Sequence, residues 1–117
     1  GRISVLLAES GGTVAGYCLW HFGYEATYAA NGIYVCDLYV RPAARGRGIG
    51  RALLAEVARR AKAEGGCFVW WTARPENKAA NAFYTALGGY QEPVIAHAVF
   101  DEAFDKLVAA AEARSTR

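Results

Sequence analysis

The spacing of apolar residues changes near Pro42, and this change limits the possible folds more than any other feature of the chain. Before Pro42 the apolar residues form short strand-like runs, whereas Leu53, Leu54 and Val57 recur at helical spacing. A strand, a helix and a further strand in succession imply parallel pairing through a right-handed crossover. We therefore expect an α/β fold with a central sheet of mixed direction.

The first forty residues predict three strands. Residues 3–9 form an apolar run that is closed by a Ser-Gly-Gly turn, and residues 13–22 resume with β-branched and aromatic side chains. This pattern is typical of an antiparallel hairpin. Residues 23–32 are rich in alanine and glycine and predict a looser segment. Residues 33–40 give the clearest strand, which proline stops.

The rest of the chain predicts three helices and two strands. The helices are expected over residues 48–64, 77–87 and 101–113, with Asp101 near the N-cap of the last. Residues 67–72 form a continuous apolar run, which is typical of a strand covered on both faces. A last strand is expected over residues 94–100.

Composition favours a single globular domain spanning residues 1–117. A chain of 117 residues with 54% hydrophobic residues can bury a core, which argues against disorder. No apolar stretch approaches the roughly 20 residues of a membrane helix, and no secretory leader opens the sequence. A net charge of +2 is too small to indicate a nucleic-acid partner.

The three cysteines are expected to behave as small buried hydrophobes. Cys18, Cys36 and Cys67 lie in apolar, strand-like contexts and form no C-x-x-C pair. Unpaired thiols fit a reducing compartment, so we expect a cytoplasmic protein. No metal site is expected.

The loop between the third strand and the first helix is the strongest candidate for a binding site. Residues 41–50 place glycines at positions 46, 48 and 50 directly before a helix, among several arginines. Glycines let backbone amides approach a ligand, and a helix N-terminus favours an anion. Neither the Walker pattern nor G-x-G-x-x-G fits, since Arg51 stands where the last glycine is required. The loop suits a phosphate or pyrophosphate; the alternative is a solvated turn that caps the helix.

Two motifs resemble those of the GCN5-related N-acetyltransferases, the GNAT superfamily. Residues 45–50 match its Q/R-x-x-G-x-G/A signature, and residues 77–90 look like its N-x-x-A-x-x-F-Y-x-x-x-G-F segment. The likeness covers residues 16–100. Residues 16–40 are similar to the spermidine/spermine (diamine) and thialysine N-acetyltransferase branch. The implied fold is a mostly antiparallel central sheet with flanking helices, lacking the N-terminal strand and helices of a full domain.

The resemblance implies an enzyme that uses acetyl-CoA as co-substrate to acetylate a primary amine of a small, polyamine- or amino-acid-like molecule. Tyr84 would be the general acid that protonates the departing thiolate. The backbone of the third strand would pair with the pantetheine arm, the loop amides would hold the pyrophosphate, and Asn77 would bond pantetheine or neighbouring backbone. The implied cofactor-binding residues are Leu38, Tyr39, Val40, Arg45, Gly46, Arg47, Gly48, Ile49, Gly50, Arg51 and Asn77.

The general base stays open. Cys36 stands where the related branch has a glutamate, and Asp37 should point to the opposite face unless a bulge re-aims it. The other candidates are a water chain or His21, Tyr24, Glu25 and Tyr34. Aromatic residues could line a pocket for a cationic amine or simply form the sheet core; they are Tyr17, Trp20, Phe22, Tyr24, Tyr28, Tyr34 and Tyr39.

Two other functions remain open. An open polar groove would favour a protein N-terminus or lysine as acceptor, and the cysteine at position 36 would fit a CoA-binding module with little catalytic activity. The N-terminal elements that shape the acceptor pocket in the superfamily would lie outside the sequence or come from a partner subunit. We expect a homodimer, with no nucleic-acid or membrane partner.

Overall fold

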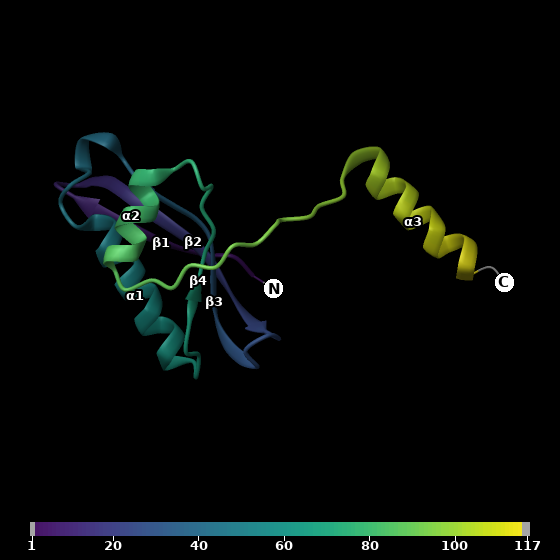
Figure 1. Cartoon of the computed structure of the whole chain (residues 1–117). Helices are drawn as coiled ribbons and strands as arrows, with labels where there is room; N and C mark the ends of the chain where they lie inside the picture. Colours follow the sequence, from purple (N-terminus) through teal and green to yellow (C-terminus); the bar gives the residue numbers. More distant parts are fainter. Residues whose placement is uncertain (1, 116–117) are drawn as a thin grey trace.

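The computed structural model describes residues 2–115, which form one four-stranded sheet and three α-helices (Figure 1). The sheet order is β1-β2-β3-β4. A single 3₁₀ turn at Pro42–Ala44 follows β3. The elements are β1 Ser4–Ser10, β2 Thr13–Glu25, β3 Ala30–Val40, α1 Ile49–Ala63, β4 Val69–Trp70, α2 Lys78–Ala86 and α3 Asp101–Ser115.

The sheet has the mixed direction that the sequence predicts. β1, β2 and β3 pair antiparallel, and β4 joins β3 in parallel after the α1 crossover. The mostly antiparallel sheet with flanking helices confirms the expected fold class. No helix among residues 2–115 is long and apolar enough to cross a bilayer.

The expected loose segment at residues 23–32 is wrong. β2 and β3 continue through it as a long hairpin, in which Gly23 pairs with Gly32. A Cβ at Gly23 would lie 2.5 Å from the ring of Tyr34, and one at Gly32 would lie 2.6 Å from the ring of Phe68. These glycines therefore make room for aromatic rings that pack on the hairpin.

The core lies between α1 and the central strands. Leu53, Leu54, Val57 and Ala61 of α1 are buried, as the helical spacing predicts. They face a sheet surface whose centre is the fully buried Ile33, together with Cys18 and Trp20. This packing holds the start of α1, and the loop before it, against the end of β3.

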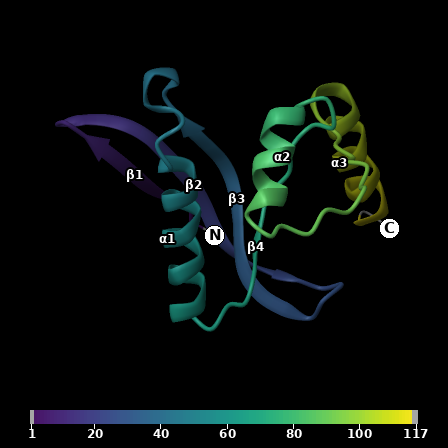
Figure 2. The same ribbon diagram turned by 60° about the vertical axis from the view of Figure 1, so that its left-hand side comes forward.

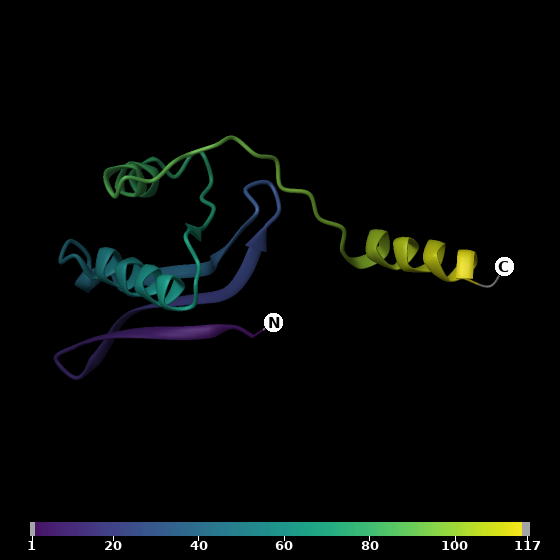
Figure 3. The same cartoon turned by 90° about the horizontal axis from the view of Figure 1, so that it is seen from below.

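The prediction of a last strand over residues 94–100 is wrong. Residues 94–100 form no strand and pair with none of the described residues. The strand predicted over residues 67–72 is also shorter, because β4 contains only Val69–Trp70. A strand exists only where a partner completes its hydrogen bonds, and the apolar pattern of residues 94–100 does not supply one. α3 consequently stands away from the rest of the molecule (Figure 3).

Only one of the three cysteines is buried. Cys18 lies in the core, whereas Cys36 and Cys67 are exposed, which corrects the expectation for those two. All three are free thiols. For Cys36 the reason is local: Leu19 pairs with Asp37 and Trp20 with Val35, which leaves Cys36 as the extra residue of a β-bulge.

Candidate functional site

The end of β3 presents an unpaired backbone edge. β4 pairs with β3 only at Ile33 and Tyr34, and the two strands then lead toward different helices (Figure 2). From Leu38 to Val40, β3 pairs with β2 alone among the described residues. Exposed N–H and C=O groups on such an edge can accept another extended chain.

The glycine loop directly continues this edge and holds two residues in the left-handed region. Gly46 has φ +79° and Gly48, the N-cap of α1, has φ +78°. A Cβ at either position would meet nothing within 4 Å, so both backbones face open space. The first α1 amide that donates to a described backbone carbonyl is Ala52, to Gly48, at 3.0 Å. The amides just before it are therefore available to a ligand.

The loop also concentrates positive charge. Its arginines, at positions 41, 45, 47 and 51, are all exposed. The ion pairs recorded among the described residues lie elsewhere, on α1 and α3. Arg45 is already oriented: its Nε donates to the carbonyl of Val40 at 2.9 Å, and its guanidinium lies 6.0 Å from the ring centroid of Tyr39. Open amides, a helix N-terminus and arginines together suit a polyanion such as pyrophosphate.

α2 closes this site through Phe83. The ring of Phe83 lies beside Gly50 and the end of β3, at 3.6 Å from the position of a Cβ on Gly50. Tyr84, the next residue, packs edge-to-face on Trp71, with ring centroids 5.1 Å apart. Burial raises the pKa of Tyr84 above its ordinary value, with a smaller contribution from the nearby Cys18. Tyr84 is therefore a protonated phenol at neutral pH, as it would be at its ordinary pKa, and can act as a proton donor.

Asn77 caps the helix that carries Phe83 and Tyr84. Its Oδ1 accepts a hydrogen bond from the amide of Ala80 at 3.3 Å, which makes Asn77 the N-cap of α2. The resemblance implied that Asn77 bonds either pantetheine or neighbouring backbone, and this hydrogen bond is the contact with neighbouring backbone. Asn77 therefore fixes where α2 begins and, through α2, where Phe83 and Tyr84 lie.

Asn77→Ala is expected to lower the free energy of unfolding by about 1 kcal/mol, because one α2 amide loses its cap. Urea denaturation followed by circular dichroism measures the change. Asn77→Ser is the matched control, since serine caps a helix nearly as well as asparagine, and it should retain most of the stability. Equal losses in both variants would contradict the capping role.

A β-bulge at Cys36 interrupts the strand alternation at Cys36 and Asp37, two positions considered for the general base. Cys36 and Asp37 are both exposed, so the alternation that would separate them is interrupted. The phenol of Tyr17 donates to Oδ2 of Asp37 at 2.8 Å, and this bond raises the pKa of Tyr17. Burial raises the pKa of the buried Cys18 thiol to about 11, so this thiol stays protonated at neutral pH.

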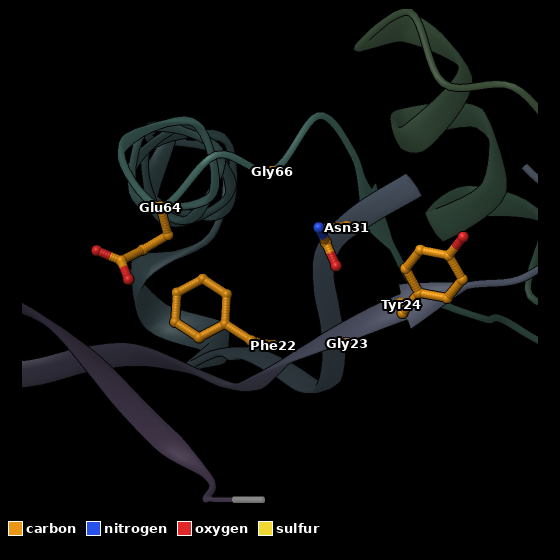
Figure 4. Close-up of a pocket in the computed structure, with 7 residues that line it drawn as sticks. Phe22, Gly23, Tyr24, Asn31, Glu64 and Gly66 are labelled. Atoms are coloured by element: carbon orange, nitrogen blue, oxygen red, sulfur yellow. The ribbon is translucent and has the colours of Figure 1, made fainter. Parts of the chain in front are cut away.

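The other base candidates lie toward the β2–β3 turn. His21 stacks on Tyr34 at 5.5 Å, and Tyr34 donates to Glu25 at 3.1 Å. The Thr27 amide and the Tyr34 phenol lower the pKa of Glu25, which keeps it ionised and makes it a weak base. Tyr24 lines a hollow with Phe22 and Glu64 between this hairpin and the end of α1 (Figure 4). That hollow lies at the opposite end of α1 from the glycine loop.

The seven aromatic residues singled out from the sequence do not share one pocket. Trp20 is buried in the core, while Tyr17 and Tyr39 pair at the candidate site with ring centroids 5.6 Å apart. Phe22 and Tyr24 belong to the hollow at the hairpin. The set is therefore divided between the sheet core and two separate places on the surface, and it does not form one aromatic pocket.

Sequence reasoning missed an apolar groove beside β4. Its lining includes Tyr28, Trp70, Trp71, Tyr84 and residues 89–94. The C-F-V-W-W run is the signal that could have found it, but its aromatic residues were assigned to a fully covered strand. Tyr84 lines the groove and follows Phe83, which lies beside Gly50, so the groove and the glycine loop both border α2.

Comparisons with known proteins agree with this geometry. The sequence profile described as the Acetyltransferase (GNAT) family matches residues 2–89. The thialysine N-epsilon-acetyltransferase of Bos taurus is 38% identical over 78 residues, which are 67% of this chain and 45% of that protein. The chain thus corresponds to less than half the length of this relative.

Two solved structures share the fold. An integron cassette protein from the mobile metagenome of V. cholerae superposes with a TM-score of 0.83 at 26% identity, covering 91% of this chain and 66% of that one. An aminoglycoside acetyltransferase from an uncultured soil metagenomic sample gives a TM-score of 0.76 at 26% identity, covering 86% and 66%.

Proposed function

The chain belongs to the Acetyltransferase (GNAT) family, and from this premise we propose that it transfers an acetyl group from acetyl-CoA to a primary amine of a small molecule. The observation that carries the proposal is the junction of β3 and α1. There an unpaired strand edge, two left-handed glycines over open space and four exposed arginines meet at one helix N-terminus. These features match the two chemical parts of CoA, an amide-containing arm and a pyrophosphate.

The residues present fit CoA. The backbone of Leu38–Val40 offers hydrogen-bonding groups to the pantetheine amides, as an added strand would use them. The amides of residues 46–51 would hold the pyrophosphate, because no side chain occupies the space above Gly46 and Gly48. When bound, acetyl-CoA supplies the activated acetyl group as a thioester.

Tyr84 is proposed as the general acid. An amine that attacks a thioester expels a thiolate, and a protonated phenol nearby lowers the barrier by donating its proton. The partly buried position of Tyr84 supports this role. The packing of Tyr84 on Trp71 fixes the direction of its ring.

The acceptor must lose a proton before it attacks, because an alkylammonium with a pKa near 10 has no free electron pair. Asp37 is the carboxylate that the bulge places at the end of β3, beside Tyr17. Water can connect it to the acceptor, but no residue is assigned as the base. The likeness to a thialysine N-epsilon-acetyltransferase favours an amino-acid-like acceptor with a side-chain amine.

Calorimetric titration with acetyl-CoA tests the cofactor part of the proposal. We expect saturable binding to acetyl-CoA and CoA and much weaker binding to ATP, which carries phosphates without a pantetheine arm. Equal affinity for ATP and CoA would contradict a role for the edge of β3. If acetyl-CoA, CoA and ATP all fail to bind, the glycine loop is only a helix cap and binds no phosphate.

A thiol-release assay then tests the acceptor. The chain is incubated with acetyl-CoA and with thialysine, lysine, spermidine or an aminoglycoside, and free CoA is measured. We expect the fastest release with thialysine. If acetyl-CoA binds but no amine causes release of CoA, the chain is a CoA-binding module. If CoA is released only with a peptide as acceptor, the chain is a protein acetyltransferase.

The proposal includes a cytoplasmic setting and a homodimer. The exposed thiols of Cys36 and Cys67 persist most readily in a reducing compartment, where acetyl-CoA is available as co-substrate. Size measurement of the purified chain and fractionation of cells that express it test these two points.

A further inference from the structure

Arg45 differs from the other arginines of the glycine loop, because the protein itself engages its side chain. Its Nε donates to the carbonyl of Val40 at 2.9 Å, and its guanidinium lies 6.0 Å from the ring centroid of Tyr39. No side-chain hydrogen bond, ion pair or ring contact joins the arginines at positions 41, 47 and 51 to another of residues 2–115. Arg45 therefore has a defined orientation before any ligand binds.

The carbonyl that Arg45 binds belongs to the open edge of β3. The amide of Arg41 donates to the carbonyl of Ala15 at 2.7 Å. The neighbouring pair on the same ladder is Val40 with Gly16. Hydrogen-bonded and non-hydrogen-bonded pairs alternate along an antiparallel ladder, so the carbonyl of Val40 points away from β2. Arg45 thus binds the last carbonyl of β3, on the edge beside which we place the pantetheine arm.

Tyr39 supports Arg45 from the sheet face that α1 does not cover. Leu38 packs against the core beneath α1, so its neighbour Tyr39 points to the opposite face. The ring of Tyr17 lies beside that of Tyr39, and the Tyr17 phenol donates to Asp37 at 2.8 Å. The guanidinium of Arg45 therefore lies against a supported aromatic ring, an arrangement that stabilises a cation.

The bond between Arg45 and Val40 closes the first half of the loop that joins β3 to α1 (Figure 2). The 3₁₀ turn Pro42–Ala44 lies between the two residues, and Ala44 within it is buried. The flexible part of the loop therefore starts at Gly46, directly after a fixed point. A fixed start lowers the conformational entropy that the following glycines lose when their amides converge on an anion.

We infer that Arg45 is a positioning residue, which fastens the glycine loop to the end of β3 through its hydrogen bond to Val40, with the ring of Tyr39 as its support. The charge that complements the phosphates is left to the arginines at positions 41, 47 and 51. The effect on CoA affinity rests on the proposed function, whereas the fastening is a property of the chain without a ligand.

Three substitutions separate the hydrogen bond of Arg45 from its charge. Arg45→Gln keeps an N–H donor as many bonds from Cα as Nε and removes the charge. Arg45→Lys keeps the charge but has a methylene at that place, and Arg45→Met has neither donor nor charge. By calorimetric titration we expect Arg45→Gln to bind CoA within about twofold of the wild type, and the other two to bind about fivefold more weakly. If the wild-type chain binds CoA, an Arg45→Gln variant that binds no better than Arg45→Lys or Arg45→Met overturns the inference.

Tyr39→Leu tests the aromatic support. Loss of the ring removes its contact with the guanidinium, and we expect the affinity for CoA to fall about threefold. Tyr24→Leu is the matched control, because Tyr24 is also an exposed strand tyrosine but lies at the β2–β3 hairpin, and it should leave the affinity unchanged. Equal affinities in the two variants would contradict the role of the Tyr39 ring.

Limited proteolysis without a ligand measures the fastening itself. Neither Arg45→Gln nor Arg45→Met leaves a trypsin site at position 45, so mass spectrometry can follow cleavage after Arg47 in both. Cleavage requires the loop to open, and we expect it to be about fivefold faster in Arg45→Met than in Arg45→Gln. Cleavage after Lys106 in α3 is the internal control and should be equal in the two. Equal cleavage after Arg47 overturns the inference, whereas the expected difference supports it even in a chain that fails to bind CoA, where only the proposed function is contradicted.

Discussion

Gly48→Val is expected to reduce acetyl-CoA affinity by about a hundredfold, through strain at φ +78° and loss of amide contacts. Valine is β-branched and avoids the left-handed region, so the N-cap of α1 must turn its backbone away from the present geometry. The amides on both sides of Gly48 then no longer converge on one anion. The Cβ would also enter the open space in which we place the pyrophosphate. Calorimetric titration of the variant measures the loss.

Gly11→Val is the matched control for this substitution. Gly11 also has a positive φ, +59°, and a Cβ there would likewise meet nothing within 4 Å. It lies in the β1–β2 turn, away from the glycine loop, so valine introduces a comparable strain without touching the site. We expect Gly11→Val to lower the melting temperature and to bind acetyl-CoA normally. Unchanged affinity in Gly48→Val would show that the loop does not bind phosphate.

The parts of the fold that depend on local signals were predictable from the sequence. The stripe of Leu53, Leu54 and Val57 identified α1, and the helix predicted over residues 77–87 corresponds to α2. Helix periodicity depends only on residues that are close together in the sequence, so it can be recognised without knowing the fold. The glycine loop lies between such signals, so its position before α1 followed as well.

Features that depend on distant partners could not be predicted in this way. The sequence predicts a loose segment at Gly23 and Gly32, whereas these glycines accommodate the rings of Tyr34 and Phe68. Phe68 follows α1 in the sequence, so it is distant from both glycines along the chain. The exposure of Cys36 follows from a bulge that only the pairing of β2 with β3 reveals. Residues 94–100 have the composition of a strand, but whether they form one depends on an edge to pair with.

The same distinction applies to the candidate site. Its binding part is continuous in sequence from Leu38 to Arg51, so the residues assigned to it adjoin in the structure. The catalytic part joins β2, β3 and α2, and its base could not be chosen from alternation alone. In the structure Asp37 lies beside the bulge near the end of β3, whereas Glu25 lies in a hydrogen-bonded cluster near the β2–β3 turn.

Tyr84→Phe is expected to lower kcat by about a hundredfold or more, the range for the loss of a positioned general acid. The dissociation constant for acetyl-CoA should remain within about twofold, because phenylalanine keeps the packing on Trp71 and no phenol contact to the cofactor is proposed. The raised pKa of Tyr84 adds a second expectation. The phenol donates only while protonated, so the alkaline fall of kcat should lie above the ordinary phenol pKa of about 10 and vanish in the variant.

Tyr24→Phe is the control for loss of a phenol. Tyr24 lies in the hollow at the β2–β3 hairpin, at the opposite end of α1 from the glycine loop, and its removal should change neither kcat nor affinity. Steady-state rates on the best acceptor and calorimetry on the same preparations separate chemistry from binding. A Tyr84→Phe variant with an unchanged rate would remove Tyr84 from acid catalysis. Parallel loss of rate and affinity would instead assign Tyr84 to positioning α2 against the end of β3.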